Sequence, residues 1–317
     1  MKVLGCLEIA AILVLIVGCG SSSQSGSGVS GGTGTMSLKL TDAPIDGASS
    51  VVVQFSEVQI RGADSTQNLN FTFDPPKSID LLTLQGTATE DLIVDKVVPA
   101  GIYDEIRLII DSELGTVNTY IVLTEGGDQI DMTVPSGSQS GLKVKGPLIV
   151  TANATTSFTI DFDVRKSIVK SGNVNSTNGV KYHLKPVLRI VDNSEVGIIS
   201  GTIADTLLTQ AAGCSDNDVL TGNAVYVYEG LGVTADDIDL DETTVEPIVT
   251  VLVEYDSVSN IYSYEAAFLT AGDYTVSLTC NADKEDIEVN ETDELAFKGT
   301  QDAPVLAGET KTVNFQY

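Results

Sequence analysis

The pattern of apolar and polar residues from Met36 onward has a period of two, which is the period of half-buried β-strands. Between residues 158 and 165 every second residue is apolar, and the residues between them are Thr, Asp, Asp and Arg. Turn-forming pairs such as Asp46-Gly47 and Asn178-Gly179 separate the apolar runs. The pattern therefore predicts an all-β domain over residues 36–193, with strands at residues 37–40, 51–60, 106–110, 120–123, 158–164 and 182–190.

A second all-β segment follows the polar stretch Asp192-Asn193-Ser194. Its short strands and their spacing indicate a small β-sandwich of immunoglobulin-like or transthyretin-like type over residues 194–317. Two β-sandwich domains agree with the length of 317 residues. The predicted strands of the second domain are residues 198–203, 224–228, 248–255, 261–268, 274–280 and 311–316.

Local features refine this picture. The parity of the apolar residues changes between Phe55 and Val58, which predicts a β-bulge. Pro186 predicts an edge strand or a second bulge, because proline cannot donate to a strand ladder. Residues 78–84 fit either a short helical turn or another strand.

The pattern Ala-Gly-x-Tyr occurs twice, at residues 100–103 and 271–274, each time just before a predicted strand. Glycine allows a tight turn, and a tyrosine can pack its ring while its hydroxyl bonds a nearby backbone group. We therefore interpret Tyr103 and Tyr274 as structural corners. The second copy resembles the turn of transthyretin-like and carboxypeptidase-regulatory-like modules.

The N-terminus carries a short apolar run at residues 9–17, which suits a signal peptide better than a membrane span of about 20 residues. The run ends in Ile16-Val17-Gly18-Cys19, which resembles the bacterial lipobox. The resemblance implies that residues 1–18 are a cleaved signal peptide and that Cys19 is lipidated and N-acylated. The alternative is an uncleaved buried helix with Cys19 in a core.

Residues 19–35 read as a flexible tether, since 12 of the 16 residues from Gly20 to Thr35 are Gly or Ser. Gly20 follows the cysteine where an aspartate would favour retention at an inner membrane. We therefore expect anchoring in the cell envelope, at the outer membrane or cell surface, through the lipid on Cys19.

The net charge of −27 is shared unevenly between the two predicted domains. Residues 36–195 hold 13 basic and 20 acidic residues, whereas residues 196–317 hold 3 basic and 23 acidic residues. Such a surface repels phosphate backbones, so nucleic acid is not an expected partner. Solubility, a salty habitat or cation binding would each account for the acidity.

Four cysteines are present. Cys6 belongs to the predicted signal peptide and Cys19 to the lipid anchor. Cys214 and Cys280 remain in an exported, oxidising setting, and such a pair indicates one disulfide. The alternatives are free thiols or a metal pair, although no His or Cys lies nearby in the sequence.

Motifs along the first domain occur in a fixed order: residues 40–44 (Leu-Thr-Asp-Ala-Pro), 99–108, 161–163 (Asp-Phe-Asp) with Arg165, and 182–187. Together they resemble DUF4382, a prokaryotic lipoprotein family of unknown function, over about residues 35–192. The resemblance implies an exported β-domain, often behind a lipobox, and carries no established activity. By itself, Asp42 in the first motif is expected to cap a turn.

Catalytic signatures are scarce. The folded part has no Gly-x-Ser-x-Gly motif, and no His, Cys and carboxylate residues have zinc spacing. The single histidine, His183, lies among cations, and we interpret it as part of a cross-strand charge ladder with Asp161 and Asp163. The absence of Trp argues against an aromatic sugar platform, though Tyr could serve.

The densest acidic run is residues 236–242, in which Asp237, Asp239 and Asp241 alternate. Alternate carboxylates can gather around Ca²⁺, which prefers six to eight oxygen ligands. The run lacks the glycine and the distal glutamate of an EF-hand. A solvated acidic loop is the alternative to a calcium site.

We expect a lipid-anchored cell-envelope protein that acts as a non-catalytic binding, adhesion or scaffold module. Two alternatives stay open: an envelope hydrolase that uses carboxylates or a metal, and a structural subunit of an envelope complex. The sequence does not define whether the partner is a protein or a glycan.

Overall fold

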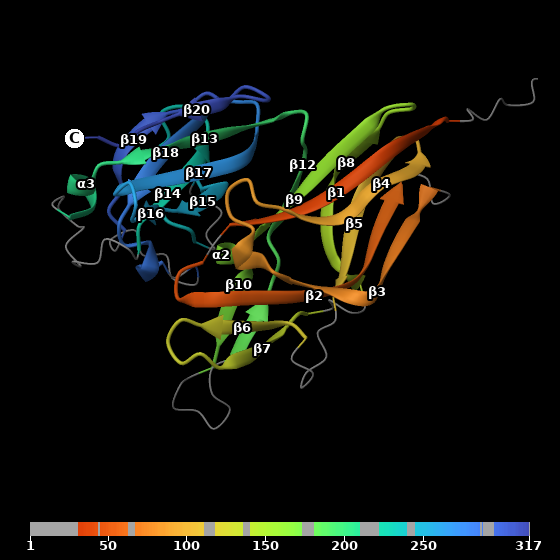
Figure 1. Cartoon of the computed structure of the whole chain (residues 1–317), viewed down its shortest axis with the longest axis horizontal. Coiled ribbons are helices and arrows are strands. Elements are labelled where there is room, and N and C mark those ends of the chain that lie inside the picture. The colour runs from red at the N-terminus through yellow and green to blue at the C-terminus, as the bar shows by residue number, and fades with distance from the viewer. Residues whose placement is uncertain are drawn as a thin grey trace, which may run out of the picture. The chain divides into compact units, whose positions relative to one another are not determined.

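In the computed structural model, residues 33–192 form two β-sheets that pack against each other (Figure 1). The structure describes residues 31–317 except residues 44, 63–66, 111–117, 136–139, 173–180, 210–221, 240–244, 286, 288–294 and 317. The strands are β1 (Thr33–Ala43), β2 (Ala48–Gly62), β3 (Leu69–Asp80), β4 (Glu90–Pro99), β5 (Gly101–Ile110), β6 (Tyr120–Leu123), β7 (Gln129–Thr133), β8 (Leu142–Val150), β9 (Thr155–Asp163), β10 (Ile168–Ser171), β11 (Lys181–Leu184) and β12 (Leu188–Asp192). One sheet has the order β12-β9-β1-β4, and the other has the order β10-β11-β7-β6-β2-β5-β8 with β3 beside β2.

Residues 196–312 contribute two further sheets of four strands each, with the orders β16-β17-β13-β20 and β15-β14-β18-β19. Their strands are β13 (Val196–Ile203), β14 (Ala224–Glu229), β15 (Val249–Leu252), β16 (Glu254–Asp256), β17 (Ile261–Thr270), β18 (Tyr274–Thr279), β19 (Lys298–Asp302) and β20 (Thr310–Thr312). The described helical segments are single turns: η2 (Leu81–Thr83), α2 (Val164–Ser167), α3 (Asp205–Thr209) and η3 (Ala282–Lys284). The predicted all-β class is confirmed.

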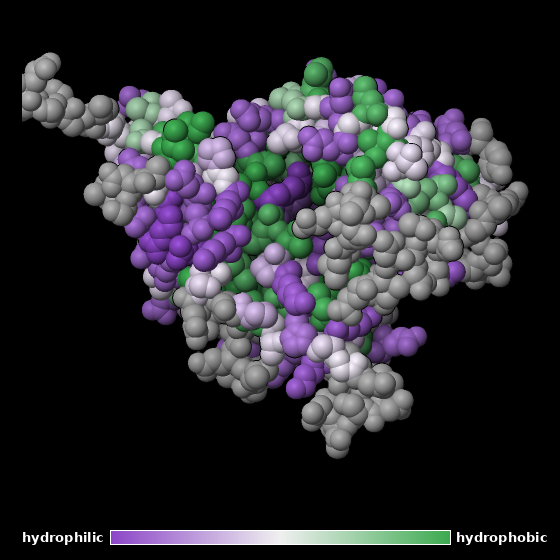
Figure 2. Space-filling view, turned by 180° about the vertical axis from the view of Figure 1, so that it is seen from behind, coloured by the Kyte–Doolittle hydropathy of each residue, from purple (hydrophilic) through white to green (hydrophobic). Residues whose placement is uncertain are grey.

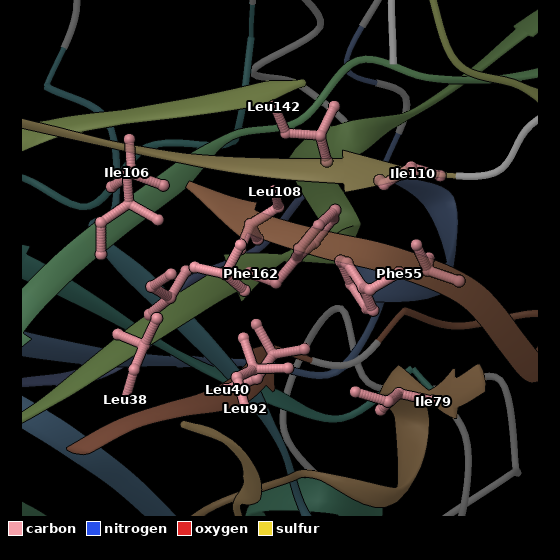
Figure 3. Packing of buried hydrophobic residues seen from close by; sticks show 14 of the residues in the cluster. Leu38, Leu40, Phe55, Ile79, Leu92, Ile106, Leu108, Ile110, Leu142 and Phe162 are labelled. Carbon is pink, nitrogen blue, oxygen red and sulfur yellow. The ribbon is translucent and has the colours of Figure 1, made fainter. Parts of the chain in front are cut away.

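The first core lies between the two sheets of residues 33–192. Leu38 and Leu40 of β1 and Phe162 of β9 pack with Phe55 of β2 and Leu108 of β5 (Figure 3). All five side chains are fully buried. The period of two in the sequence thus reports which side chains enter this core.

The polar face of β9 departs from the prediction of a half-buried strand. Thr159, Asp161 and Asp163 alternate with the core residues as expected, yet they are 0%, 7% and 8% exposed. β9 pairs with β1 in parallel and with β12 in antiparallel orientation, so it lies inside its sheet. The carboxylates on its outer face therefore need partners, because buried polar groups are costly without hydrogen bonds.

The predicted bulge in β2 is confirmed, and it has a clear role. The register of β2 with β3 and with β5 shifts between Phe55 and Glu57. Residues 48–52 pair with β6, whereas residues 55–62 pair with β5. The bulge thus marks the point at which one long strand changes its neighbour.

Residues 78–84 take both of the predicted conformations. The end of β3 is extended, and η2 follows it with Asp80 as the N-terminal cap, which accepts from Leu82 N. Pro186 lies between β11 and β12, which belong to different sheets. The predicted edge strand or bulge at Pro186 is therefore not observed, because the chain crosses from one sheet to the other between Leu184 and Leu188.

β1 begins at Thr33, within the stretch that composition assigns to the flexible tether. Thr35 N donates to Ala154 O at 2.9 Å, and Asn153 N donates to Thr33 O at 2.9 Å. A Cβ atom on Gly34 would lie 2.4 Å from Thr151 O. The glycine is therefore required here by close backbone approach, and the tether ends before Thr33.

Both Ala-Gly-x-Tyr patterns form the predicted corners. Tyr103 Oη donates to Pro99 O at 2.7 Å, and Tyr274 Oη donates to Thr270 O at 2.6 Å. Both rings are buried, and each hydroxyl bonds the carbonyl four residues before it. Each tyrosine thus fixes the connection that leads into its strand.

β14 is buried on both faces. Val225 and Val227 enter the core between the two sheets of residues 196–312. Tyr226 and Tyr228 point to the opposite face, where they belong to a third apolar cluster with Ala224, Val169, Ile238, Ala282, Ile287 and Leu295. Since Val169 lies on β10, this cluster joins the first pair of sheets to the second.

A turn at residues 192–195 separates the strands of the first two sheets from those of the last two, and Glu195 N donates to Asp192 O there. Residues 32–317 form one compact unit, so the division into domains at residue 193 stays a prediction.

Among the described residues, none of the helices has the length and apolar character needed to cross a bilayer. Apolar residues are not confined to the cores, since the face seen in Figure 2 has a hydrophobic hollow beside a strongly hydrophilic region.

Candidate functional site

The first motif places Asp42 near the end of β1, where the strand reaches α2. Asp42 Oδ1 accepts from Val164 N at 3.2 Å, and Oδ2 is buried without a hydrogen-bond partner. Burial, together with the charges of Asp161 and Asp163, raises the pKa of Asp42 well above its usual value. The carboxyl joins α2 to β1 through Val164 N, and it also interacts with the backbone N–H of the adjacent residue Ala43.

The Asp-Phe-Asp motif ends in the N-terminal cap of α2. Asp163 Oδ1 accepts from Lys166 N at 3.0 Å. Ser167 Oγ donates to Asp163 O at 2.5 Å and accepts from Val187 N at 2.8 Å. Burial raises the pKa of Asp163, although Lys166 opposes that shift. These bonds fix the single turn of α2 and the direction in which Arg165 and Lys166 leave it.

Three basic side chains, Arg165, Lys166 and Arg189, form what we call the bridging cluster. Each bonds an aspartate within residues 33–192 and a backbone carbonyl within residues 196–317. Arg165 Nη2 donates to Asp46 Oδ2 at 2.6 Å, and its Nη1 donates to Ala282 O at 3.0 Å. Lys166 Nζ forms an ion pair with Asp163 Oδ2 at 3.6 Å and donates to Pro247 O. Arg189 Nε donates to Asp161 Oδ2 at 2.7 Å, and its Nη1 donates to Phe268 O at 2.9 Å. Basic side chains of α2 and β12 thus connect residues 33–192 to residues 196–317.

Arg165 is the most buried member of the bridging cluster, with 4% of its surface exposed. It lines a pocket of about 150 Å³ together with Asp46 and Glu285. Glu285 Oε2 accepts from Tyr226 Oη at 2.6 Å. Burial raises the pKa of Glu285, and the hydrogen bond from Tyr226 and the charge of Arg165 oppose the rise. In this small pocket Arg165 is thus paired with Asp46, and Glu285 is bonded to Tyr226 beside the pocket.

His183 lies on β11, and its partners differ from the predicted ones. Its Nδ1 contacts Thr133 Oγ1, and its Nε2 lies 2.5 Å from Ser171 Oγ. The predicted ladder of His183 with Asp161 and Asp163 is therefore wrong, because β11 and β9 belong to different sheets. Arg189 takes that place instead, directly opposite Asp161 in the register of β12 and β9.

The acidic run is only partly a surface feature. Asp237 and Asp239 are 3% and 8% exposed, so these two residues do not belong to a solvated loop. Asp237 Oδ1 is buried without a hydrogen-bond partner, and burial is the main cause that raises the pKa of Asp237 to about 6. Glu246, whose Oε1 accepts from Asp239 N at 3.3 Å, has a pKa raised to about 7, again mainly by burial.

No metal centre follows from this arrangement. Within the described ranges, no group of three His, Cys, Asp or Glu side chains is placed to hold a metal ion. Asp241, the third predicted ligand, lies outside the described residues. The calcium site of Asp237, Asp239 and Asp241 stays a prediction.

The cysteine predictions also fall partly outside the described residues. Cys280 directly follows β18 and is buried, with 2% of its surface exposed. Cys214 and Cys19 both lie outside the described residues. The disulfide between Cys214 and Cys280 and the lipidation of Cys19 therefore stay predictions.

The bridging role of Arg165 and Arg189 was not predicted from the sequence. Arg165 stands within a recognised motif, and the strand parity placed Arg189 beside His183, but neither signal names a distant carbonyl as the partner. Strand parity alone could have predicted that Arg189 lies opposite Asp161.

Residues 33–186 match the family model described as Domain of unknown function (DUF4382). No curated protein matches the chain. Among solved structures, the chain shows distant similarity to pilins and fimbrial proteins. GBS52, the minor pilin of Streptococcus agalactiae, is 12% identical over 88% of this chain and 94% of that chain, with a TM-score of 0.18.

Two further structures are similar at the same level. A fimbrial protein from Bacteroides ovatus is 9% identical over 90% of this chain and 49% of that chain, with a TM-score of 0.21. A double mutant of the shaft pilin SpaA from Lactobacillus rhamnosus GG is 11% identical over 89% of this chain and 98% of that chain, with a TM-score of 0.18. Scores this low carry no argument about activity.

Proposed function

We propose that this protein, whose residues 33–186 form a DUF4382 domain, is a lipid-anchored, non-catalytic binding or scaffold module of the cell envelope. The observation that carries the proposal is the bridging cluster. Asp161, Asp163 and Arg165 belong to the motifs of that domain, and each bonds a partner within the chain. Motif residues that bond partners within the chain stabilise its fold, as expected for a rigid scaffold.

The lipid anchor in this proposal rests on the sequence. Ile16-Val17-Gly18-Cys19 ends the apolar N-terminal run, and a Gly/Ser-rich stretch leads from it to β1. A diacylated cysteine with an added N-acyl chain would hold the protein stably, because one acyl chain alone binds only marginally. The sheets at residues 33–312 would then be presented next to the membrane on a short tether.

The anchor is tested by labelling cells with an alkynyl fatty acid during expression of the full chain. We expect the wild-type protein to be labelled and to fractionate with membranes. Cys19→Ala should be unlabelled and should keep its N-terminal residues, because processing requires the modified cysteine.

Cys6→Ala is the matched control, since it removes the other N-terminal cysteine, and it should be labelled like the wild type. Labelling of the Cys19→Ala variant, or its normal cleavage and membrane retention, would contradict the proposed anchor.

A further inference from the structure

An aromatic pair lies on the hairpin of β16 and β17. Tyr255 and Tyr262 are directly opposite each other in the antiparallel register. Their ring centroids are 4.6 Å apart and the ring planes differ by 29°, so the rings are stacked. Tyr255 is 38% exposed, which leaves part of the stacked pair open to solvent.

Polar side chains surround this pair in an open pocket of about 470 Å³. The lining includes Asp205, Tyr255, Asn260, Ile261, Tyr262 and Gln316. Tyr255 Oη donates to Asn260 Oδ1 at 2.8 Å, which orients the amide and leaves its NH₂ group available. Asp205 is close enough that its charge, after burial and Tyr255, contributes to a raised pKa of Tyr262.

The pair differs from the structural aromatic residue two positions farther along β17. Tyr264 is 3% exposed, its hydroxyl donates to Val313 O at 2.8 Å, and its ring packs 5.6 Å from that of Phe315. By contrast, Tyr255 is exposed and the neighbouring Ile261 is 44% exposed. The stacked pair therefore packs against the core through Tyr262 and presents an exposed face at Tyr255.

We propose that the pocket formed by Asp205, Tyr255, Asn260, Tyr262 and Gln316 binds a neutral saccharide. One face of a sugar ring presents C–H groups, which pack well on an exposed aromatic ring. The hydroxyls at the ring edge require both donors and acceptors, which the amide and carboxylate side chains provide. The absence of Trp from the sequence had argued against an aromatic sugar platform, yet the hairpin brings two tyrosines together to form one.

The charge of this region selects against other ligands that stack on aromatic rings. Residues 196–317 hold 23 acidic and 3 basic residues, and Asp205 lies in the pocket itself. Nucleic acids and anionic glycans would meet this negative potential. A neutral sugar would bind without that repulsion.

This inference gives a ligand class to the binding module proposed above and rests on its non-catalytic binding role. The lipid anchor is measured separately by acyl labelling. Failure of saccharide binding with normal labelling of Cys19 would overturn the ligand class and leave the anchor intact.

The test is isothermal titration of the full chain with a panel of neutral hexasaccharides: cellohexaose, maltohexaose, xylohexaose, mannohexaose and chitohexaose. We expect at least one to bind the wild-type protein. Tyr255→Ala should weaken that binding at least tenfold, because the open aromatic face is removed. Tyr120→Ala is the matched control, a half-buried tyrosine on β6, and should bind like the wild type.

Tyr255→Phe keeps the ring and removes the hydroxyl that orients Asn260, so we expect binding within about threefold of the wild type. Melting temperatures of the variants confirm that each is folded. Binding by none of the five sugars, or equal affinities for Tyr255→Ala and Tyr120→Ala, would overturn the proposal.

Discussion

The role of Asp42 depends on residues that lie far from it in the sequence. The sequence places it in a Leu-Thr-Asp-Ala-Pro motif, where an aspartate before a proline is expected to cap a turn. In the structure its carboxyl reaches α2, more than 120 residues away in the chain, and is buried beside two further aspartates. A local pattern identifies a residue with a hydrogen-bonding role, but it does not identify a partner that only the fold brings close.

Asp42→Asn should reduce the loss of stability that the protein shows as the pH rises. The pKa of Asp42 is higher in the folded state than in the unfolded state, so its contribution is fully present below the unfolded pKa of about 3.9 and is lost as the pH rises through the folded pKa. The wild type should therefore lose up to about 1.4 kcal/mol per pH unit over that range through this group. Asparagine mimics the protonated carboxyl and does not titrate.

The measurement is the melting temperature of the full chain from pH 5 to pH 8. We expect Asp42→Asn to gain stability relative to the wild type as the pH rises, until the pH exceeds the folded pKa of Asp42. Asp128→Asn changes an exposed aspartate and should follow the wild type. Parallel curves for Asp42→Asn and the wild type would show that burial does not raise the pKa of Asp42.

At the scale of the elements, the two-residue period of apolar positions predicts the strands that supply the cores, including β1, β2, β5 and β9. The prediction missed β3, β4, β7, β8, β10 and β19. β8 is a plain omission, since its residues alternate between buried and exposed, with a Gly-Pro pair in the middle of the strand; the others show the pattern less clearly. β3 contains two prolines and alternates between half-buried and exposed residues, and β19 is mostly exposed. Burial creates the sequence signal, so strands that bury little show little of it.

The two tyrosine corners were predictable because all of their parts lie within five residues. Tyr103→Phe and Tyr274→Phe should each lower the free energy of unfolding by about 0.5–1.5 kcal/mol. Each variant keeps the buried ring and loses the hydrogen bond to the carbonyl four residues before it. The loss is measured by urea unfolding of the full chain.

Tyr120→Phe serves as the control for the corners, since Tyr120 is half-buried and precedes no such turn. We expect its unfolding midpoint to match that of the wild type. If Tyr103→Phe and Tyr274→Phe unfold at the same urea concentration as this control, the hydroxyls do not stabilise the corners.

At the scale of the whole molecule, the sequence predicts two β-rich segments and the boundary between them, but it does not predict how the two segments are joined. Arg189 and Asp161 could be paired from strand parity. The second bonds of Arg165, Lys166 and Arg189 end on backbone carbonyls, which every residue carries, so no side-chain pattern marks them. Joining through these bonds is a property of the folded chain alone.

The bridging cluster should make residues 32–317 unfold as one cooperative unit. In the double variant Arg165→Met and Arg189→Met, both side chains keep apolar bulk but lose their bonds to Asp46, Asp161 and the two carbonyls. Breaking a buried pair costs about 3–5 kcal/mol, and we expect the lower end for Arg165 because the side chain of Asp46 is 18% exposed. In differential scanning calorimetry of the full chain, the wild type should show one transition and the double variant two, of which at least one lies at lower temperature.

Lys145→Met removes an exposed cation from β8 and should leave the single transition unchanged. A single, unshifted transition in the double variant would mean that apolar contacts such as those of Val169 join the two pairs of sheets without the bridging cluster.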